Sequence, residues 1–146
     1  MRKIIITVLC VAFIIGSFSV AYGSQPVSVL VDGKPVVAET SAAIVSGRTM
    51  LPFRAVFNAL GVSDNSIRWN ASSRSIEVWS HNKYIFLAIG STFAIVNDGI
   101  TDHMVLLDAA PYIEVGRTMV PVRFVAETLG ADVQWEESSR TVIITK

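Results

Sequence analysis

Residues 47–61, GRTMLPFRAVFNALG, are nearly repeated by residues 116–130, GRTMVPVRFVAETLG. A stretch of this length written twice in one short chain indicates an internal structural repeat. Gly47 and Gly116 open the two copies, and glycine permits the positive φ that a sharp reversal needs. Each copy therefore predicts a chain reversal that leads into a second element of structure.

That second element should be a helix in both copies. Pro52 and Pro121 are suited to open helices, because the N–H that proline lacks would have no partner in the first turn. Apolar residues then recur at the i, i+3, i+4, i+7 spacing of a helix face, namely Phe53, Val56, Phe57 and Leu60 in the first copy and Val122, Val125, Ala126 and Leu129 in the second. Gly61 and Gly130 follow, at the position where helices commonly end.

The repetition extends to both sides of these stretches. Residues 29–36, VLVDGKPV, correspond to residues 94–101, AIVNDGIT, and residues 67–79, IRWNASSRSIEVW, correspond to residues 133–145, VQWEESSRTVIIT. Asp-Gly between apolar runs favours a hairpin, and the alternation favours strands. We assign repeat units to about 27–90 and 92–146, the first with an additional strand-like segment at 83–90.

The predicted fold class is α+β, a mainly antiparallel β-sheet packed with two short helices and built from two similar β-β-α-β-β units. One unit is too short to bury its helix stripe alone, so the two units should complete one core. No linker rich in Pro, Gly or Ser separates them. We expect a single pseudo-twofold domain over residues 24–146.

The N-terminus has the layout of a secretory signal peptide. A short basic start precedes the apolar run at residues 4–15, and small and polar residues follow it. Cleavage fits after Gly23, giving a signal peptide over 1–23, or after Ala21. A retained anchor is the alternative, but the apolar run is shorter than the roughly 20 residues of a spanning helix. We expect a secreted or cell-envelope protein without a membrane span after cleavage.

Composition limits the partners of the mature chain. The only cysteine, Cys10, lies in the signal segment, so an exported protein would hold its fold by burial without disulfides. Loss of Arg2 and Lys3 leaves 10 basic against 12 acidic side chains, a formal charge of −2. So small a charge does not indicate a nucleic-acid or membrane partner.

The order of these motifs resembles the copper amine oxidase N-terminal-like domain, also called the stalk domain. The resemblance rests on the Asp-Gly turn, GRTM-x-P-x-R, Leu-Gly, and a tryptophan followed by Ser-Ser-Arg, in both units. It implies a small α+β domain of secreted and cell-envelope bacterial proteins. It implies no catalytic residues and no cofactor, because the copper and quinone chemistry of amine oxidases belongs to a separate catalytic domain. The loop before Trp69, GVSDNSIRW, is longer than the family pattern.

The residues themselves also argue against catalysis. His81, expected in a turn, and His103, expected in a polar loop, lack the spacing of a metal site. No Gly-x-Ser-x-Gly motif or other nucleophile arrangement is evident. We expect neither a metal site nor an enzyme.

The arginines of the motif admit two interpretations. Arg48 and Arg117 could pin the reversal through bonds to the backbone. Arg54 and Arg123 fall in the first helical turn, where the helix dipole opposes a cation and a specific partner is needed. The four could form a clamp for an anion or a sugar acid, or they could tie helix to sheet. We favour tethers, because glycines and prolines that matter only for backbone geometry repeat with them.

The three tryptophans fall into two groups. Trp69 and Trp135 occupy the same place in each unit and should be core. The structural motif therefore comprises Gly47, Arg48, Pro52, Arg54, Trp69, Gly116, Arg117, Pro121, Arg123 and Trp135. Trp79 has Thr145 as its counterpart, and with Tyr84 and Phe86 it could form an aromatic platform. Alternatively, that face packs against the other unit.

We therefore expect a secreted, non-catalytic structural or interaction module of the bacterial cell envelope. The alternative is a carbohydrate or cell-wall glycan-binding module that uses the aromatic platform. A protein or a cell-wall polysaccharide is a possible partner, and the sequence does not define the oligomeric state. The tether interpretation predicts that Arg123→Ala lowers the Tm markedly, whereas loss of the charge at Lys83 does not.

Overall fold

The computed structural model describes residues 26–146, and the predicted signal peptide lies outside these residues. The helices of this part are α1 (Phe53–Ala59), α2 (Val122–Thr128) and the short 3-10 helix η1 (Asp64–Ser66). The strands are β1 (Ser28–Val31), β2 (Lys34–Pro35), β3 (Ala43–Val45), β4 (Arg48–Pro52), β5 (Ile67–Asn70), β6 (Ser75–Ser80), β7 (Lys83–Ala88), β8 (Phe93–Asn97), β9 (Asp102–Leu106), β10 (Tyr112–Glu114), β11 (Arg117–Pro121), β12 (Asp132–Glu136) and β13 (Thr141–Thr145).

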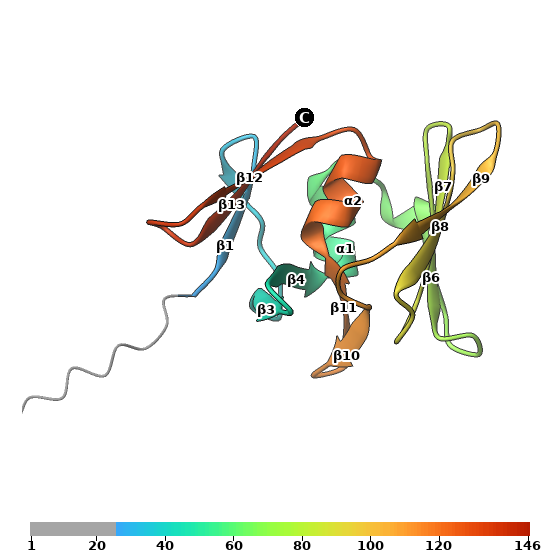
Figure 1. Ribbon diagram of the computed structural model, residues 1–146, viewed down its shortest axis with the longest axis horizontal. Coiled ribbons are helices and arrows are strands. Elements are labelled where there is room, and N and C mark those ends of the chain that lie inside the picture. Colours follow the sequence, from blue (N-terminus) through green and yellow to red (C-terminus); the bar gives the residue numbers. More distant parts are fainter. Residues whose placement is uncertain (1–25) are drawn as a thin grey trace, which may run out of the picture.

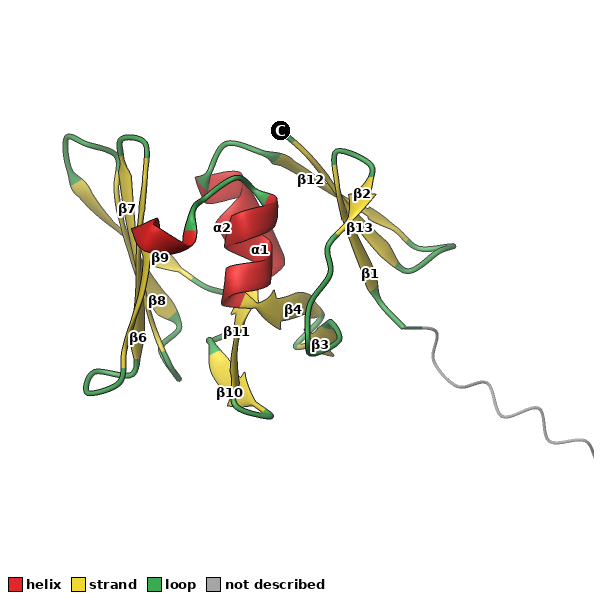
Figure 2. Ribbon diagram, turned by 180° about the vertical axis from the view of Figure 1, so that it is seen from behind, coloured by secondary structure: helices red, strands yellow, loops and turns green. Residues whose placement is uncertain are grey.

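The strands form three sheets around the two α-helices. Their orders are β12-β13-β1-β2, β10-β11-β4-β3 and β5-β6-β7-β8-β9. Figure 1 shows α1 and α2 side by side between the first and the third sheet, and Figure 2 shows the same layers from behind. The strand pairs within residues 26–146 are antiparallel, apart from the parallel pair of β1 and β13. The α+β class with mainly antiparallel strands is confirmed.

The glycine reversals are two-residue hairpin turns. Ser46 and Gly47 have φ of +51° and +72°, and Val115 and Gly116 have φ of +48° and +71°. Positive φ at both central residues matches the twist of antiparallel strands and is typical of a tight hairpin. The residues after each glycine form β4 and β11, strands that the sequence interpretation did not assign between the reversal and the helix. Each unit thus places more short strands before its helix than the β-β-α-β-β description contains.

The two copies of the motif pair with each other at the centre of the molecule. In the antiparallel pair of β4 and β11, Leu51 lies opposite Val120, Met50 opposite Pro121, and Pro52 opposite Met119. These are equivalent positions of the two units, taken in reverse order. The register is the one that a twofold relation requires. The pseudo-twofold arrangement stays a prediction that this register supports.

The helix boundaries agree with the sequence signals. Pro52 and Pro121 are the N-cap residues, one position before the helices begin. Gly61 and Gly130 follow the C-cap leucines with φ of +91° and +90°. Their N–H groups donate to the carbonyls of Asn58 at 2.9 Å and Glu127 at 3.0 Å. The predicted helix ends are confirmed, because only a residue that tolerates positive φ closes a helix in this way.

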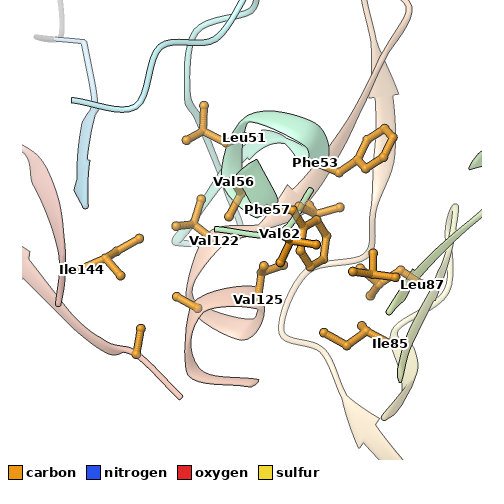
Figure 3. Close-up of a cluster of buried hydrophobic side chains, with 14 of the residues drawn as sticks. Leu51, Phe53, Val56, Phe57, Val62, Ile85, Leu87, Val122, Val125 and Ile144 are labelled. Carbon is orange, nitrogen blue, oxygen red and sulfur yellow. The ribbon is translucent and has the colours of Figure 1, made fainter. Parts of the chain in front are cut away.

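Both units contribute to the main core cluster, and Met50, Ala109 and Met119 form a second, smaller cluster. Phe57 of α1 and Val125 of α2 are both fully buried, with 0% of the side chain exposed. Figure 3 shows Ile85 and Leu87 of the third sheet on one side of the helices and Ile144 of the first sheet on the other. The extra segment predicted at 83–90 is β7, which lies between β6 and β8. Its inward residues fill the core on the side of unit one.

Candidate functional site

The third sheet has one face buried against the helices and one face turned away from them. Ile76, Val78, Ile85, Leu87 and Ala94 are buried at 0–1% exposure. Because side chains alternate along a strand, their neighbours form the opposite surface, which we call the outer face: Trp79, Tyr84, Phe86, Phe93, Ile95, Met104 and Leu106. This surface runs across four adjacent strands, β6 to β9.

The outer face is unusually apolar for a surface. Met104 is 73% exposed, Leu106 68%, Phe93 51% and Trp79 44%. Contiguous exposed apolar side chains on a soluble domain mark sites of interaction, whereas single ones are common. The corresponding surface of the first sheet is mixed: Asp132, Gln134, Glu136 and Thr145 are exposed, whereas its apolar residues Ile143 and Leu30 are half-buried. The apolar surface therefore belongs to the third sheet, in which β6 and β7 come from unit one and β8 and β9 from unit two.

The three aromatic residues predicted as a platform do lie together, but not in one plane. Trp79 is the cross-strand neighbour of Tyr84, with ring centroids 5.4 Å apart and planes inclined by 46°. The guanidinium of Arg68 lies 5.5 Å from the centroid of the Trp79 ring and is paired with Glu77 at 2.7 Å. Arg68 thus covers part of the tryptophan surface that a sugar ring would need. Burial, and secondarily Glu77, raises the pKa of Tyr84 above its ordinary value of 10.0.

A cleft lies beside α2 and is also lined by residues of β12 and of the β3–β4 hairpin. Its volume is about 550 Å³, within the range of roughly 300–1,000 Å³ typical of small-ligand sites. Its polar lining includes Arg48 and Asp108 at one end and Arg123, Glu127 and Glu137 along the helix and the β12–β13 turn. Residues from both repeat units therefore meet in it.

Two arginines of the motif join the units crosswise. Arg48 Nε donates to Asp108 Oδ2 at 2.7 Å, and Arg117 pairs with Glu39. Glu39 and Asp108 are equivalent positions, so each unit supplies one arginine and one carboxylate. Arg48 reaches the turn only through a long bond to the Gly47 carbonyl, 3.4 Å. Because these side chains are about half exposed, each pair contributes at most about 1 kcal/mol.

The other two arginines lie in the first helical turn, as predicted, but they have different partners. Arg54 Nη1 donates to Asp64 Oδ1 at 3.1 Å. Arg123 Nη1 lies 3.2 Å from Glu127 Oε1 and 3.2 Å from the carbonyl oxygen of Val133. Arg123 thereby links α2 to β12. The four arginines do not converge on one anion site.

Arg123→Ala should lower the free energy of unfolding by about 1 kcal/mol, because it removes one bond to the sheet and a half-exposed ion pair. This is less than the marked effect that the sequence predicted, since the side chain is 49% exposed. Lys83 is no suitable control, because its Nζ donates to the Thr128 carbonyl at the end of α2 at 2.5 Å. Urea denaturation should show Lys34→Ala unchanged, and equal losses in both variants would contradict the tether.

Trp69 and Trp135 are half-buried and pack against the main core. Their positions differ in what lies beside them. Trp135 also lines the cleft, and its Nε1 donates to Glu137 Oε2 at 2.5 Å. Trp135 therefore has one surface in the core and one in the cleft.

The two histidines make local contacts. His81 is in the β6–β7 turn, with φ of +52°. His103 is in β9, not in a loop as predicted, and its Nε2 lies 3.1 Å from Asp98 Oδ2. The backbone N–H groups of Thr101 and Ile100, followed by His103, lower the pKa of Asp98 to about 2. Within residues 26–146, no three or more His, Cys, Asp or Glu side chains are grouped to hold a metal ion.

The repeated unit and its three sheets define a small α+β domain whose halves share one core. The profile of the copper amine oxidase N-terminal domain matches residues 30–144, and the chain belongs to this family. The resemblance inferred from the motifs is confirmed. The family is the non-catalytic N-terminal part of copper amine oxidases. No curated protein and no solved structure gave a significant match. In the part of the chain from Pro26 onward, no helix is long and apolar enough to cross a membrane.

Sequence reasoning found Trp79, Tyr84 and Phe86 but missed the aliphatic part of the outer face. A signal was present, because β8 reads FAIVN and β9 reads DHMVL, with apolar residues on both faces of each strand. Such a pattern is typical of strands covered on both sides. Here only one side is covered by the domain itself.

Proposed function

We propose that this protein is an exported, non-catalytic interaction module of the bacterial cell envelope that binds a partner protein through the outer face. The observation that carries the proposal is the run of exposed apolar side chains across β6 to β9. The signal-like N-terminus and the family membership support export and a non-catalytic role.

The chemistry of the outer face favours a protein over a glycan or a lipid surface. Met104, Leu106 and Ile95 are flexible or branched aliphatic side chains, which fit apolar protein surfaces and lack the flat π-face that stacks on a sugar. The charged side chains of the face are Arg68, Glu77 and Asp102, of which the first two pair with each other. A surface for anionic lipids would instead carry an excess of Lys and Arg around its apolar residues.

Site-specific photo-cross-linking tests this proposal on the full chain with its own leader. A photo-reactive phenylalanine derivative replaces Met104, and in a control chain it replaces Thr145 on the polar surface of the other sheet. We expect one discrete protein adduct in the envelope fraction from position 104 and none from position 145. Phe93→Lys should abolish the adduct, because it places an ammonium in the apolar contact while changing a side chain that is already 51% exposed.

Several outcomes would contradict the proposal. Equal adducts from positions 104 and 145 would show that contact is unspecific. Adducts only with lipid, or only with a second copy of the chain, would assign the face to a membrane or to self-association. An adduct confined to the cytoplasm would contradict export. Circular dichroism of Phe93→Lys checks that the fold is retained.

A further inference from the structure

The cleft beside α2 is a second site, which borders the proposed protein contact only at its edge. We propose that it binds an uncharged glycan, with Trp135 facing the sugar and Arg123 and Glu127 bonding its hydroxyls. Most of the cleft lies between α2 and the inner side of β12, and it borders the outer face at Leu106 of β9. The two proposals are tested at different residues, Trp135 and Glu127 for the cleft and Phe93 and Met104 for the outer face, so either can fail without the other.

The balanced charges of the cleft disfavour an anion as its occupant. Three arginines, Arg48, Arg123 and Arg140, line it together with three carboxylates, Asp108, Glu127 and Glu137. Arg48 is paired with Asp108, and Arg123 with Glu127. A site for an anion or a sugar acid needs uncompensated positive charge. The clamp considered from the sequence is therefore the less favoured occupant.

The same groups suit a ligand that both donates and accepts hydrogen bonds. Guanidinium groups offer several donors in a plane, and carboxylates offer several acceptors. Neighbouring hydroxyls of a pyranose present both functions within the reach of one such side chain. Because the pairs are about half exposed, little stability is lost when they turn toward a ligand.

The apolar lining completes the match. Trp135 and Phe124 line the cleft and are half-buried. The bond from Trp135 Nε1 to Glu137 fixes the orientation of the indole ring. The C–H side of a sugar ring is apolar and packs against such a surface, and a side chain held in place loses little entropy on binding.

The repeat shows which of these residues are not needed for the fold. Unit one has Asn58 where unit two has Glu127, and Ala71 where unit two has Glu137. Trp69, the counterpart of Trp135, is not part of this cleft. The two acidic residues are thus additions of unit two to a shared scaffold. The repeat also supplies a matched control position for the tryptophan.

The test titrates the full-length protein, after export, with three uncharged tetrasaccharides, cellotetraose, chitotetraose and maltotetraose. Tetragalacturonic acid serves as a charged ligand of equal length. The chain has three tryptophans, so their indole N–H signals in a two-dimensional ¹H–¹⁵N NMR spectrum report separately on the cleft, on Trp69 and on the outer face. We expect at least one uncharged tetrasaccharide to bind with a Kd of about 1 mM or lower and to shift the Trp135 signal.

Isosteric variants separate a binding role from a structural one. Glu127→Gln should weaken binding at least about tenfold, because a charged acceptor becomes a neutral amide. Glu136→Gln, on the adjacent strand position that faces away from the cleft, should bind as the original protein does. Trp69→Phe should leave the affinity unchanged.

The proposal is overturned if none of the three uncharged tetrasaccharides binds, or if tetragalacturonic acid binds in preference to them. It is also overturned if the Trp79 signal moves while the Trp135 signal stays in place. Equal affinities of Glu127→Gln and the original protein would remove Glu127 from the site. Unfolding in urea, followed for each variant, shows that losses of affinity do not reflect losses of fold.

Discussion

Phe57→Ala is expected to lower the free energy of unfolding by about 3–5 kcal/mol, the range for removing a large aromatic side chain from a closed core. Phe57 is 0% exposed and lies in the cluster where α1, α2 and the third sheet meet. Removing the ring leaves a cavity, because the two helices and the sheet are held apart by their other contacts. Urea denaturation monitored by circular dichroism measures the loss.

Phe93→Ala is the matched control, since it truncates a phenylalanine that is 51% exposed on the outer face. It should change stability by no more than about 1 kcal/mol. The helix position equivalent to Phe57 in unit two is Ala126, which is also buried. If the units are related by a twofold axis, Ala126→Phe combined with Phe57→Ala should recover part of the loss. A double variant less stable than Phe57→Ala would contradict that relation.

Gly116→Val is expected to destabilise the protein by about 1–3 kcal/mol through backbone strain. Gly116 has φ of +71° in the β10–β11 hairpin. At such a φ, the branched side chain of valine clashes with its own backbone. A Cβ at this position meets no atom within 4 Å, so crowding adds nothing to the effect. Thermal and urea unfolding both measure the change.

Gly116→Asn separates strain from the mere addition of a side chain. Asparagine adopts positive φ far more readily than valine, so this variant should retain most of the stability. Gly47→Val should behave like Gly116→Val, because Gly47 occupies the same place in the β3–β4 hairpin with φ of +72°. Equal losses in Gly116→Asn and Gly116→Val would contradict the strain explanation.

The sequence predicted the elements that depend on local chemistry. The helices follow from their apolar stripes and terminal glycines, and the hairpins follow from glycines at reversals. The additional strand was predicted as well, because residues 83–90 alternate. The same alternation in β6 buries Ile76 and Val78 and leaves Trp79 exposed.

The contacts between distant residues could not be predicted. The residues around Arg48 do not show that its partner is Asp108, because the two side chains come close only when the two units pair. His103 was predicted in a loop because its neighbours in the sequence are polar. Its strand, β9, is defined by pairing with β8, which the local sequence does not show. The cleft was missed for the same reason, since its residues come from several segments of both units.

The parallel pair of β1 and β13 has a consequence for the order of assembly. Residues 28–31 pair with residues 141–144, so the first strand of the domain completes its sheet only after residue 144 has been made. A growing chain on the ribosome therefore lacks the complete first sheet until both repeat units have been made. Contacts of such high sequence separation form late and slowly. The two repeat units therefore cannot complete their sheets one after the other, and we expect the domain to fold as one unit.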